Sequence, residues 1–268
     1  MSTNTHIFLT GASSGIGLET ARLFAARGFS VWGASREVKR LPALANFHPV
    51  VMDLMDVKSI RENFAAALKQ AGHFDVLINN AGAGVFGPLE AQPDELVHEQ
   101  FQLLFHAPLE LIRLALPHMR ERGAGRIINV SSLAARFPVP YLGTYNATKA
   151  ALVSLSQSLR LELAHTPIRV IDVQPGNINT NFQASTRRVW GNLDADRVNA
   201  AWGKIDKDMS VAPPPELVAR AIVKIVTQAN PPPVVTVGNF FQARLGPFLT
   251  RLGSPRIIEA FLRRYYGM

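Results

Sequence analysis

The chain has 268 residues, of which 47% are hydrophobic and 18% charged, and it contains no cysteine. So apolar a composition must bury its surface, which excludes a disordered or fibrous chain, and this length suits one large domain (1–268) better than two. The lack of cysteine excludes disulfides, thiolate metal ligands and a cysteine nucleophile. Because the sequence has no apolar run of about 18 residues and no cationic, apolar N-terminus, we expect a cytoplasmic protein.

Lysine and arginine number 28 against 20 aspartates and glutamates, which gives a formal charge of +8. The excess is scattered except for a group near the end: Arg244, Arg251, Arg256, Arg263 and Arg264. A basic chain can meet nucleic acid, an anionic membrane or an anionic ligand. Since no basic run interleaves with aromatic residues and no reader motif is present, we expect no nucleic-acid binding.

Short apolar runs alternate with amphipathic segments of helical length along most of the chain. The runs that predict strands are His6–Leu9, Ser30–Ala34, Val50–Met52, Val76–Ile78, Arg126–Val130, Ile168–Val173 and Val234–Val237. The segments that predict helices are Ile16–Arg27, Val57–Ala71, Pro93–Arg120, Tyr145–Ala164 and Pro215–Thr227. Buried strands linked by helical crossovers predict an α/β fold: a doubly wound, mostly parallel sheet with helices on both faces. In such a fold ligands bind at the carboxyl ends of the strands.

The first expected strand leads through the sequence TGASSGIG (residues 10–17) directly into a helix. Three glycines allow a tight turn and the close approach of a pyrophosphate, and the helix N-terminus attracts its charge. The segment therefore predicts a dinucleotide site. The residues that we expect to contact the dinucleotide here are Gly11, Ser13, Ser14, Gly15, Ile16 and Gly17.

The second expected strand ends in Ala34, Ser35 and Arg36, where NAD-binding sheets carry an acid that holds the adenine ribose. A neutral Ser35 beside the guanidinium of Arg36 suits a phosphate on that ribose, so we expect NADP. The alternative is that Glu37 supplies the missing acid and Arg36 is a surface charge, which would predict NAD.

Tyr145 and Lys149 lie four residues apart at the start of an expected helix and therefore on one face of it. A tyrosine titrates near about 10, and a neighbouring ammonium favours the phenolate and brings the pKa toward the working range. The pair can thus act as an acid and a base. Ser132 follows the expected strand Arg126–Val130.

TGxxxGxG, the serine and YxxxK, in this order and spacing, resemble the short-chain dehydrogenase/reductase family, and the likeness runs from Thr5 to about Val237. Further matches are Asp53-Leu54, Asn79-Asn80-Ala81-Gly82 and Pro175-Gly176 with Thr180. The resemblance implies a Rossmann-type fold and an NADP-dependent enzyme acting on CH–OH groups, with no metal. It implies a hydride passed between nicotinamide and a carbonyl or secondary alcohol.

The same resemblance assigns roles to individual residues. Tyr145 would exchange a proton with the substrate oxygen, Ser132 would hydrogen-bond that oxygen, and Lys149 would bind the nicotinamide ribose and lower the pKa of Tyr145. The remaining cofactor residues implied by the family pattern are Asp53 and Leu54 at the adenine, Asn80, Ala81 and Gly82 along the cofactor, and Pro175, Gly176, Ile178 and Thr180, of which Ile178 and Thr180 would fix the carboxamide.

One position departs from the family pattern. Leu104 stands where the family usually has an asparagine that supports a proton relay to the active-site lysine, and an apolar side chain cannot make those hydrogen bonds. Gln100, one helical turn earlier, is a candidate substitute. The alternative is an NADP-binding regulatory or scaffold protein with little or no turnover.

The segment 183–212 has no clear periodicity and predicts a lid over the substrate, or else a plain surface excursion. The apolar residues expected near the site predict a hydrophobic substrate, such as a steroid, a retinoid or a fatty chain: Leu133, Phe137, Tyr141, Leu142, Phe182, Trp190 and Trp202. The C-terminal extension, residues 240–268, alternates Phe and Leu with Arg over Phe240–Tyr266; it fits core packing, a subunit partner or peripheral membrane contact, the last not favoured. By resemblance we expect a homodimer or homotetramer.

Overall fold

The computed structural model describes residues 5–191, 195–239 and 254–268. The strands are β1 (His6–Thr10), β2 (Ser30–Ser35), β3 (Phe47–Val51), β4 (Val76–Asn79), β5 (Val85–Phe86), β6 (Gly125–Val130), β7 (Ile168–Pro175), β8 (Arg187–Arg188) and β9 (Val234–Val237). The α-helices are α1 (Gly15–Ala25), α2 (Val57–Ala71), α3 (Asp94–Phe101), α4 (Ala107–Glu121), α5 (Gly143–Glu162), α6 (Phe182–Ser185), α7 (Ala195–Ser210), α8 (Glu216–Thr227) and α10 (Pro255–Tyr266). Short 3₁₀ turns lie at Val38–Arg40, Leu89–Ala91 and Leu133–Ala135.

Seven strands form one sheet in the order β3-β2-β1-β4-β6-β7-β9, and each adjacent pair is parallel. This is the doubly wound, parallel α/β sheet that the sequence predicts. The order reverses between β1 and β4, so the loops after these strands open on opposite sides and leave a crevice between them. A separate small ribbon pairs β5 with β8, which brings the loop after β4 beside the segment after α6.

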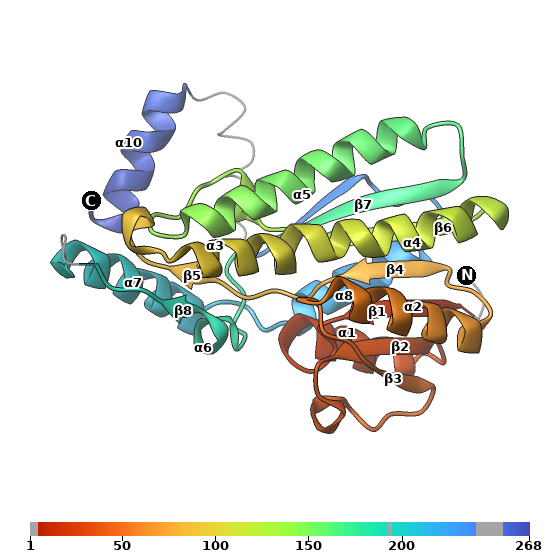
Figure 1. Cartoon of the computed structure of the whole chain (residues 1–268). Coiled ribbons are helices and arrows are strands. Elements are labelled where there is room, and N and C mark those ends of the chain that lie inside the picture. The colour runs from red at the N-terminus through yellow and green to blue at the C-terminus, as the bar shows by residue number, and fades with distance from the viewer. Residues whose placement is uncertain (1–4, 192–194, 240–253) are drawn as a thin grey trace.

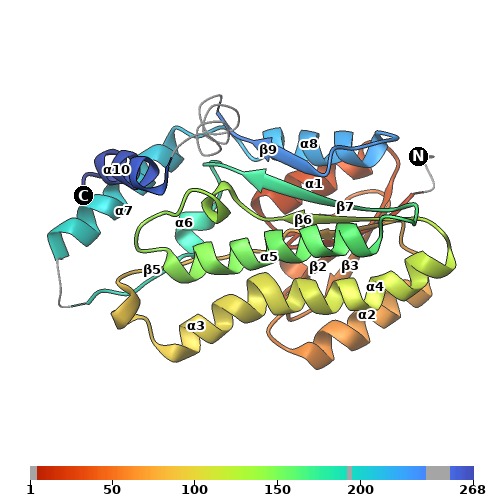
Figure 2. The ribbon, with the colours of Figure 1, turned by 90° about the horizontal axis from the view of Figure 1, so that it is seen from above.

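Two apolar clusters fill the space between the sheet and its helices. Successive residues of β1 point to opposite faces, so Phe8 packs with α2, α4 and α5, whereas Ile7 and Leu9 pack with α1 and α8. Figure 2 shows these two groups of helices on opposite sides of the strands. Burial on both faces explains why the strands lack polar alternation.

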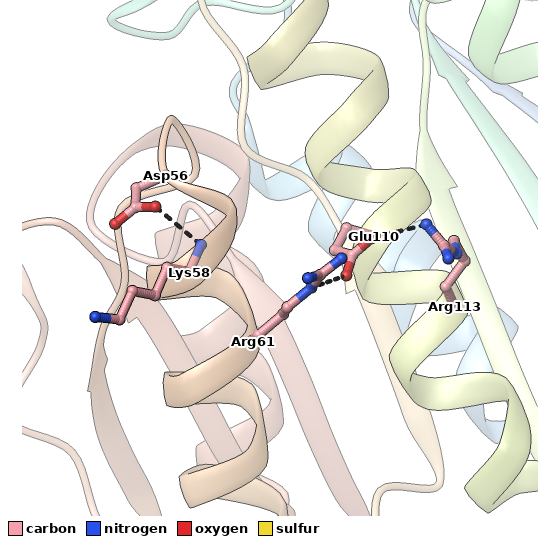
Figure 3. A network of polar contacts seen from close by, with 5 residues as sticks. All are labelled: Asp56, Lys58, Arg61, Glu110 and Arg113. Atoms are coloured by element: carbon pink, nitrogen blue, oxygen red, sulfur yellow. Dashed lines mark hydrogen bonds and ion pairs between the residues drawn. The ribbon is translucent and has the colours of Figure 1, made fainter.

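A polar link holds α2 against α4. Arg61 Nε donates to Glu110 Oε1 at 2.6 Å, and Arg113 Nη1 donates to Glu110 Oε2 at 3.2 Å (Figure 3). Asp56 caps the start of α2 by accepting a hydrogen bond from the backbone N–H of Lys58 at 2.8 Å. Of these contacts, the bond between Arg61 and Glu110 joins α2 to α4.

The segment expected as one helix, Pro93–Arg120, is interrupted. Its first part is α3 and its last part is α4, and between them Gln102–His106 forms a π-helical turn in which the N–H of Ala107 donates to the carbonyl oxygen of Gln102. A π turn inserts one extra residue and is frequent at functional sites.

α7 and α10 lie together at one end of the molecule, the end toward which the carboxyl end of β7 points (Figures 1 and 2). The helix α7 occupies part of the segment 183–212, for which the sequence showed no clear period. Residues 240–253 of the expected C-terminal extension lie outside the described residues, and its last part forms α10. Of the helices within the described residues, none is both long and apolar enough to span a membrane.

Candidate functional site

The loop after β1 has a backbone that only glycines support. Gly11 and Gly15 have φ values of +69° and +52°, in the left-handed region. Gly17 is required for a different reason, because a Cβ atom there would lie 2.1 Å from the carbonyl oxygen of Gly11. The loop therefore folds tightly onto the first turn of α1, and the N–H groups of that turn face the crevice as an anion site.

A second loop, after β4, is tied directly to the first. The backbone N–H groups of Asn80 and Ala81 donate to Thr10 Oγ1 at 2.9 and 3.1 Å, and Asn80 Nδ2 donates to the carbonyl oxygen of Thr10 at 2.9 Å. These bonds hold the segment 80–82 beside the glycine loop. The two loops flank the point where the strand order reverses.

A single cavity of about 1110 Å³ joins nearly all the residues that the sequence singled out. Its walls include Gly11, Ser13, Ser14, Gly15, Ile16, Ser35, Arg36, Asp53, Leu54, Asn80, Ala81, Gly82, Ser132, Tyr145, Lys149, Pro175, Gly176, Ile178 and Thr180. Gly17 is the exception, because it packs behind the loop against Gly11 and does not line the cavity. The long cavity, the tight glycine loop and the helix N-terminus together fit a dinucleotide.

At one end of the cavity lie Ser35, the last residue of β2, and Arg36, and Arg40 from the turn Val38–Arg40 joins them. Glu37 is exposed and does not line the cavity. Asp53, which follows the neighbouring strand β3, also lines the cavity, and its carboxylate accepts a hydrogen bond from the N–H of Met55 at 3.0 Å. Arg40 was missed in the sequence because nothing in its spacing marks it; a short 3₁₀ turn brings it back to the strand end.

Further along the cavity, Ser132 follows β6 while Tyr145 and Lys149 project from the first turns of α5. Lys149 is 4% exposed, and its Nζ donates to the carbonyl oxygen of Val130 at 2.9 Å. The same Nζ lies 5.8 Å from the centre of the Tyr145 ring. The three side chains predicted as the catalytic group thus share one wall.

Burial governs the titration of this group. It raises the pKa of Tyr145 to about 12, and a hydrogen bond with Ser132 opposes the rise. Burial also lowers the pKa of Lys149 to about 8, and the negative charge of Asp172 opposes the fall. The expected lowering of the Tyr145 pKa is therefore outweighed in this structure, because the loss of hydration of the phenolate exceeds what its neighbours supply.

Behind this wall lies a buried carboxyl group that the sequence did not bring to notice. Asp172 on β7 has no exposed surface, accepts a hydrogen bond from Ser131 Oγ, and accepts another from Gln174 Nε2 at 2.5 Å. Burial raises the pKa of Asp172, while these two hydrogen bonds oppose the rise.

A family model described as short chain dehydrogenase matches residues 5–189. The chain belongs to the short-chain dehydrogenase/reductase family. It is similar to the 3-ketodihydrosphingosine reductase of Bacteroides thetaiotaomicron, with 34% identity over 247 residues that cover 91% of this chain and 88% of the relative. Like other members of the family, the protein is an oxidoreductase of the type that uses a nicotinamide dinucleotide.

Solved structures of the family give the same fold. A short-chain dehydrogenase from Streptomyces avermitilis matches with a TM-score of 0.82 and 30% identity over 97% of this chain and 95% of that chain. Serine dehydrogenase in complex with NADP⁺ matches with a TM-score of 0.76, 27% identity and coverage of 87% and 94%. A 3-ketoacyl-(acyl-carrier-protein) reductase from Brucella melitensis, in complex with NADH, matches with a TM-score of 0.73, 26% identity and coverage of 86% and 94%. Relatives of this short-chain dehydrogenase/reductase thus bind either form of the cofactor.

Leu104, the departure from the family pattern, lies within the π-helical turn and is 1% exposed. Its Cδ2 atom would lie 3.6 Å from a Cβ atom placed on Gly82, so it packs against the segment 80–82 after β4. Gln100, one turn earlier, is 3% exposed and lines the cavity.

The far end of the cavity is mostly apolar, but its lining differs from the expected set. Leu133, Phe137, Leu142 and Phe182 line it. Tyr141, Trp190 and Trp202 instead pack around the buried ring of Phe86, with ring centres 5.7, 6.5 and 4.8 Å away. Side chains from α7 and α10 take their place: Ile205, Asp208, Met209, Ile257, Ile258, Phe261, Leu262, Tyr265 and Tyr266.

The segment 183–212 contributes Ala184, Ser185 and Arg187 to the cavity wall besides the residues of α7. On α7 the sequence pointed to Trp202 as a site residue, whereas the residues of this helix that line the cavity are Ile205, Asp208 and Met209. Within the described residues, no group of three or more His, Asp or Glu side chains is placed to hold a metal ion.

Proposed function

We propose that the protein is an NADPH-dependent reductase of hydrophobic ketones. The observation that carries the proposal is the placement of Ser132, Tyr145 and Lys149 on one wall of a cavity whose ends differ in kind. One end is basic, at Arg36 and Arg40, and the other is apolar. A reduced nicotinamide bound between them supplies a hydride to the carbonyl carbon.

The side chains of this wall manage the proton. With its pKa near 12, Tyr145 carries its proton at neutral pH and can donate it to the substrate oxygen as negative charge develops there. Ser132 Oγ offers that oxygen a second hydrogen bond. The ammonium of Lys149 stabilises the phenolate that remains, and its hydrogen bond to Val130 fixes its position.

NADP preference is supported by the basic end of the cavity. Arg36 and Arg40 both line it, whereas Glu37, the acid next to Arg36 in the sequence, does not. Two guanidinium groups suit the dianionic 2′-phosphate of NADP, which NAD lacks. Replacing both arginines with alanine should raise the KM for NADPH by about tenfold to a hundredfold and leave the KM for NADH nearly unchanged. Arg27→Ala, just beyond the C-terminal end of α1 and outside the cavity lining, is the matched control.

The substrate is proposed as a long-chain ketone. The apolar lining from α6, α7 and α10 makes a wall of aliphatic and aromatic side chains beyond Tyr145, with room for an alkyl chain. The similar Bacteroides thetaiotaomicron protein is named as a reductase of 3-ketodihydrosphingosine. In this proposal α7, with the segment 183–212 around it, acts as a lid over the chain.

Two further features belong to the proposal. We infer a homodimer or homotetramer in which α4 and α5 meet their counterparts, as is usual in the family. A regulatory or scaffold protein without turnover, which Leu104 suggested, finds no support, since the family match covers all three catalytic positions and the similar proteins are named as reductases and dehydrogenases.

The test follows the loss of NADPH absorbance over ketones of increasing chain length. We expect kcat/KM to rise with each methylene until the apolar end is filled, and oxidation of the matching alcohols with NADP⁺. Tight NADPH binding with no turnover of any carbonyl compound would contradict the proposal. Equal turnover of short polar and long apolar ketones would contradict the substrate class alone.

A further inference from the structure

Gln100 on α3 has one half of its amide bonded and the other half free. Its Nε2 donates to the carbonyl oxygen of Ala83 at 2.8 Å. A carbonyl oxygen only accepts, so this bond fixes which way the amide points. Its Oε1 is buried and accepts no hydrogen bond from any of the residues that the structure describes.

A buried glutamine that serves packing alone looks different in this chain. Gln92 is 7% exposed; its Nε2 donates to the carbonyl oxygen of Gly87 at 3.0 Å, and its Oε1 accepts from Thr144 Oγ1 at 2.9 Å. Burying an acceptor without a partner destabilises a fold, so such atoms are usually paired. Gln100 therefore carries an acceptor that the described part of the chain leaves unpaired.

The position of Gln100 indicates where a partner would come from. Four buried side-chain polar atoms in the described residues lack a hydrogen bond, and Gln100 is the one residue among these that lines the cavity shared with Ser132 and Tyr145. Its neighbours in the lining include Glu99, whose carboxylate is 2.8 Å from Arg187 Nη1 and so is already paired. The free acceptor at this point is a neutral amide oxygen.

We propose that Gln100 Oε1 accepts a hydrogen bond from the substrate, and that the preferred ketones carry an amino or hydroxyl group close to the carbonyl. This inference rests on the proposed ketone reduction and names its substrate class more closely. A role in a water relay to Lys149 is less well supported. Leu104 is the next residue on that helical face, packs against the segment 80–82 and offers no hydrogen bond to a water chain.

The test compares two substrates and three variants. The substrates are a long-chain 2-amino-3-ketone and the 3-ketone of the same length without the amine. Gln100→Leu removes the acceptor at similar volume, and Gln100→Glu retains an acceptor oxygen. Gln70→Leu is the matched control, because Gln70 lies on α2 away from the cavity and its Oε1 accepts from Trp32 Nε1.

We expect the wild-type protein to prefer the amino ketone by about tenfold to a hundredfold in kcat/KM, because one buried hydrogen bond to the substrate distinguishes the two. Gln100→Leu should reduce that preference to near unity by lowering kcat/KM for the amino ketone alone. Gln100→Glu should retain most of the preference, and Gln70→Leu should retain all of it.

Several results would overturn the inference. An equal loss for both ketones in Gln100→Leu, with a shifted pH profile, would assign Gln100 to proton transfer. A fall in kcat/KM for both ketones, together with a lower midpoint in urea unfolding, would assign Gln100 to packing. Equal turnover of the two ketones by the wild-type protein would overturn the donor preference while leaving ketone reduction intact, whereas no turnover of either would contradict the proposed function itself.

Discussion

The ammonium of Lys149 lies 5.8 Å from the centre of the Tyr145 ring and donates its hydrogen bond to a backbone carbonyl rather than to the phenol oxygen. Lys149 is buried and Tyr145 is half-buried, and the loss of hydration pushes each toward its neutral form. At neutral pH the pair therefore consists of a neutral phenol beside an ammonium whose pKa is only about 8. This arrangement suits donation of a proton to a carbonyl oxygen.

The phenol itself gives the first prediction. Tyr145→Phe removes the proton donor without changing the ring that packs against Phe182, whose centre is 5.4 Å away. We expect turnover to fall by about a hundredfold to ten-thousandfold while the Kd for NADPH, followed by its fluorescence, changes little. Tyr141→Phe is the control, because that ring packs on Phe86 outside the cavity. Turnover that survives in Tyr145→Phe would remove the acid role.

The second prediction concerns the buried carboxylate of Asp172. Because Lys149 must be charged to stabilise the phenolate, the rate of reduction should decline as the pH rises through about 8. The charge of Asp172 raises the pKa of Lys149, so Asp172→Asn should move this decline to lower pH. Gln174 can rotate its amide to suit the new asparagine. A pH–rate profile of kcat/KM measures the shift, and an unchanged profile would show that the two charges are not coupled.

How far the sequence predicts this molecule depends on whether a signal is local. The strand β9 and the helix α2 have the bounds that periodicity predicts, because a buried face repeats at a fixed spacing. The strand β3 begins three residues earlier than expected. It lies at the edge of the sheet, where one face meets solvent and residues such as Val51 are 49% exposed, so its apolar pattern is weak.

The candidate site also divides into features with a local sequence signal and features that depend on tertiary packing. The glycine loop and the Tyr145–Lys149 pair are fixed by chemistry at short spacing, so they could be predicted. The free acceptor of Gln100 and the carboxylate of Asp172 depend on which distant segments they meet. The π-helical turn at Gln102–His106, which interrupts a continuous apolar pattern, also depends on such packing and has no sequence signature that we can name.

The third prediction concerns Gly17 and the glycine loop after β1. In Gly17→Ala the new methyl group would meet the carbonyl oxygen of Gly11 at 2.1 Å, so the loop must shift away from α1. We expect a lower midpoint in urea unfolding and a loss of NADPH affinity of at least about tenfold, because the loop and the helix N-terminus no longer bind the phosphates together.

Gly203, inside α7, supplies the matched control. A Cβ atom there has no described atom within 4 Å, so Gly203→Ala should raise the free energy of unfolding by up to about 1 kcal/mol through helix propensity. Equal behaviour of Gly17→Ala and Gly203→Ala in both assays would contradict the steric argument.

The fourth prediction concerns two histidines, His48 on β3 and His73 just after α2. Burial lowers the pKa of His48, which stacks on Trp32 with ring centres 4.2 Å apart, and burial also lowers the pKa of His73. A folded-state pKa below the ordinary value of about 6.5 means that the unfolded chain binds more protons just below that pH. Stability should therefore be fully present above about pH 6.5 and decline below it.

Urea unfolding at several pH values between about 5 and 8 measures this decline. His48→Gln and His73→Gln should flatten it, since neither variant takes up a proton on unfolding. His98→Gln is the control, because His98 is exposed on α3. A decline of the same steepness in all three variants would assign the acid sensitivity to other groups.

The last prediction concerns the contact between α10 and α7. Tyr265 Oη donates to Asp208 Oδ2 at 2.7 Å, and Lys204 Nζ, 4.4 Å from the centre of the Tyr265 ring, lies 2.5 Å from Asp208 Oδ1. This contact holds Phe261 and Leu262 against the apolar end of the cavity. Tyr265→Phe removes a hydrogen bond that contributes about 1 kcal/mol. The helix should then be held less firmly, and the KM for a long-chain ketone should rise several-fold while that for a short ketone stays the same.

Removing residues 255–268 should have the same effect more strongly, because the apolar wall from α10 is then lost altogether. Arg263→Ala, an exposed change on the same helix, is the control. The thermal midpoint of each variant separates loss of the wall from loss of the fold, since α10 lies at one end of the molecule and contacts mainly α7. If the KM rises equally for short and long ketones, α10 does not contact the alkyl chain, and the chain length that the cavity accepts must be set by α6 and α7 alone.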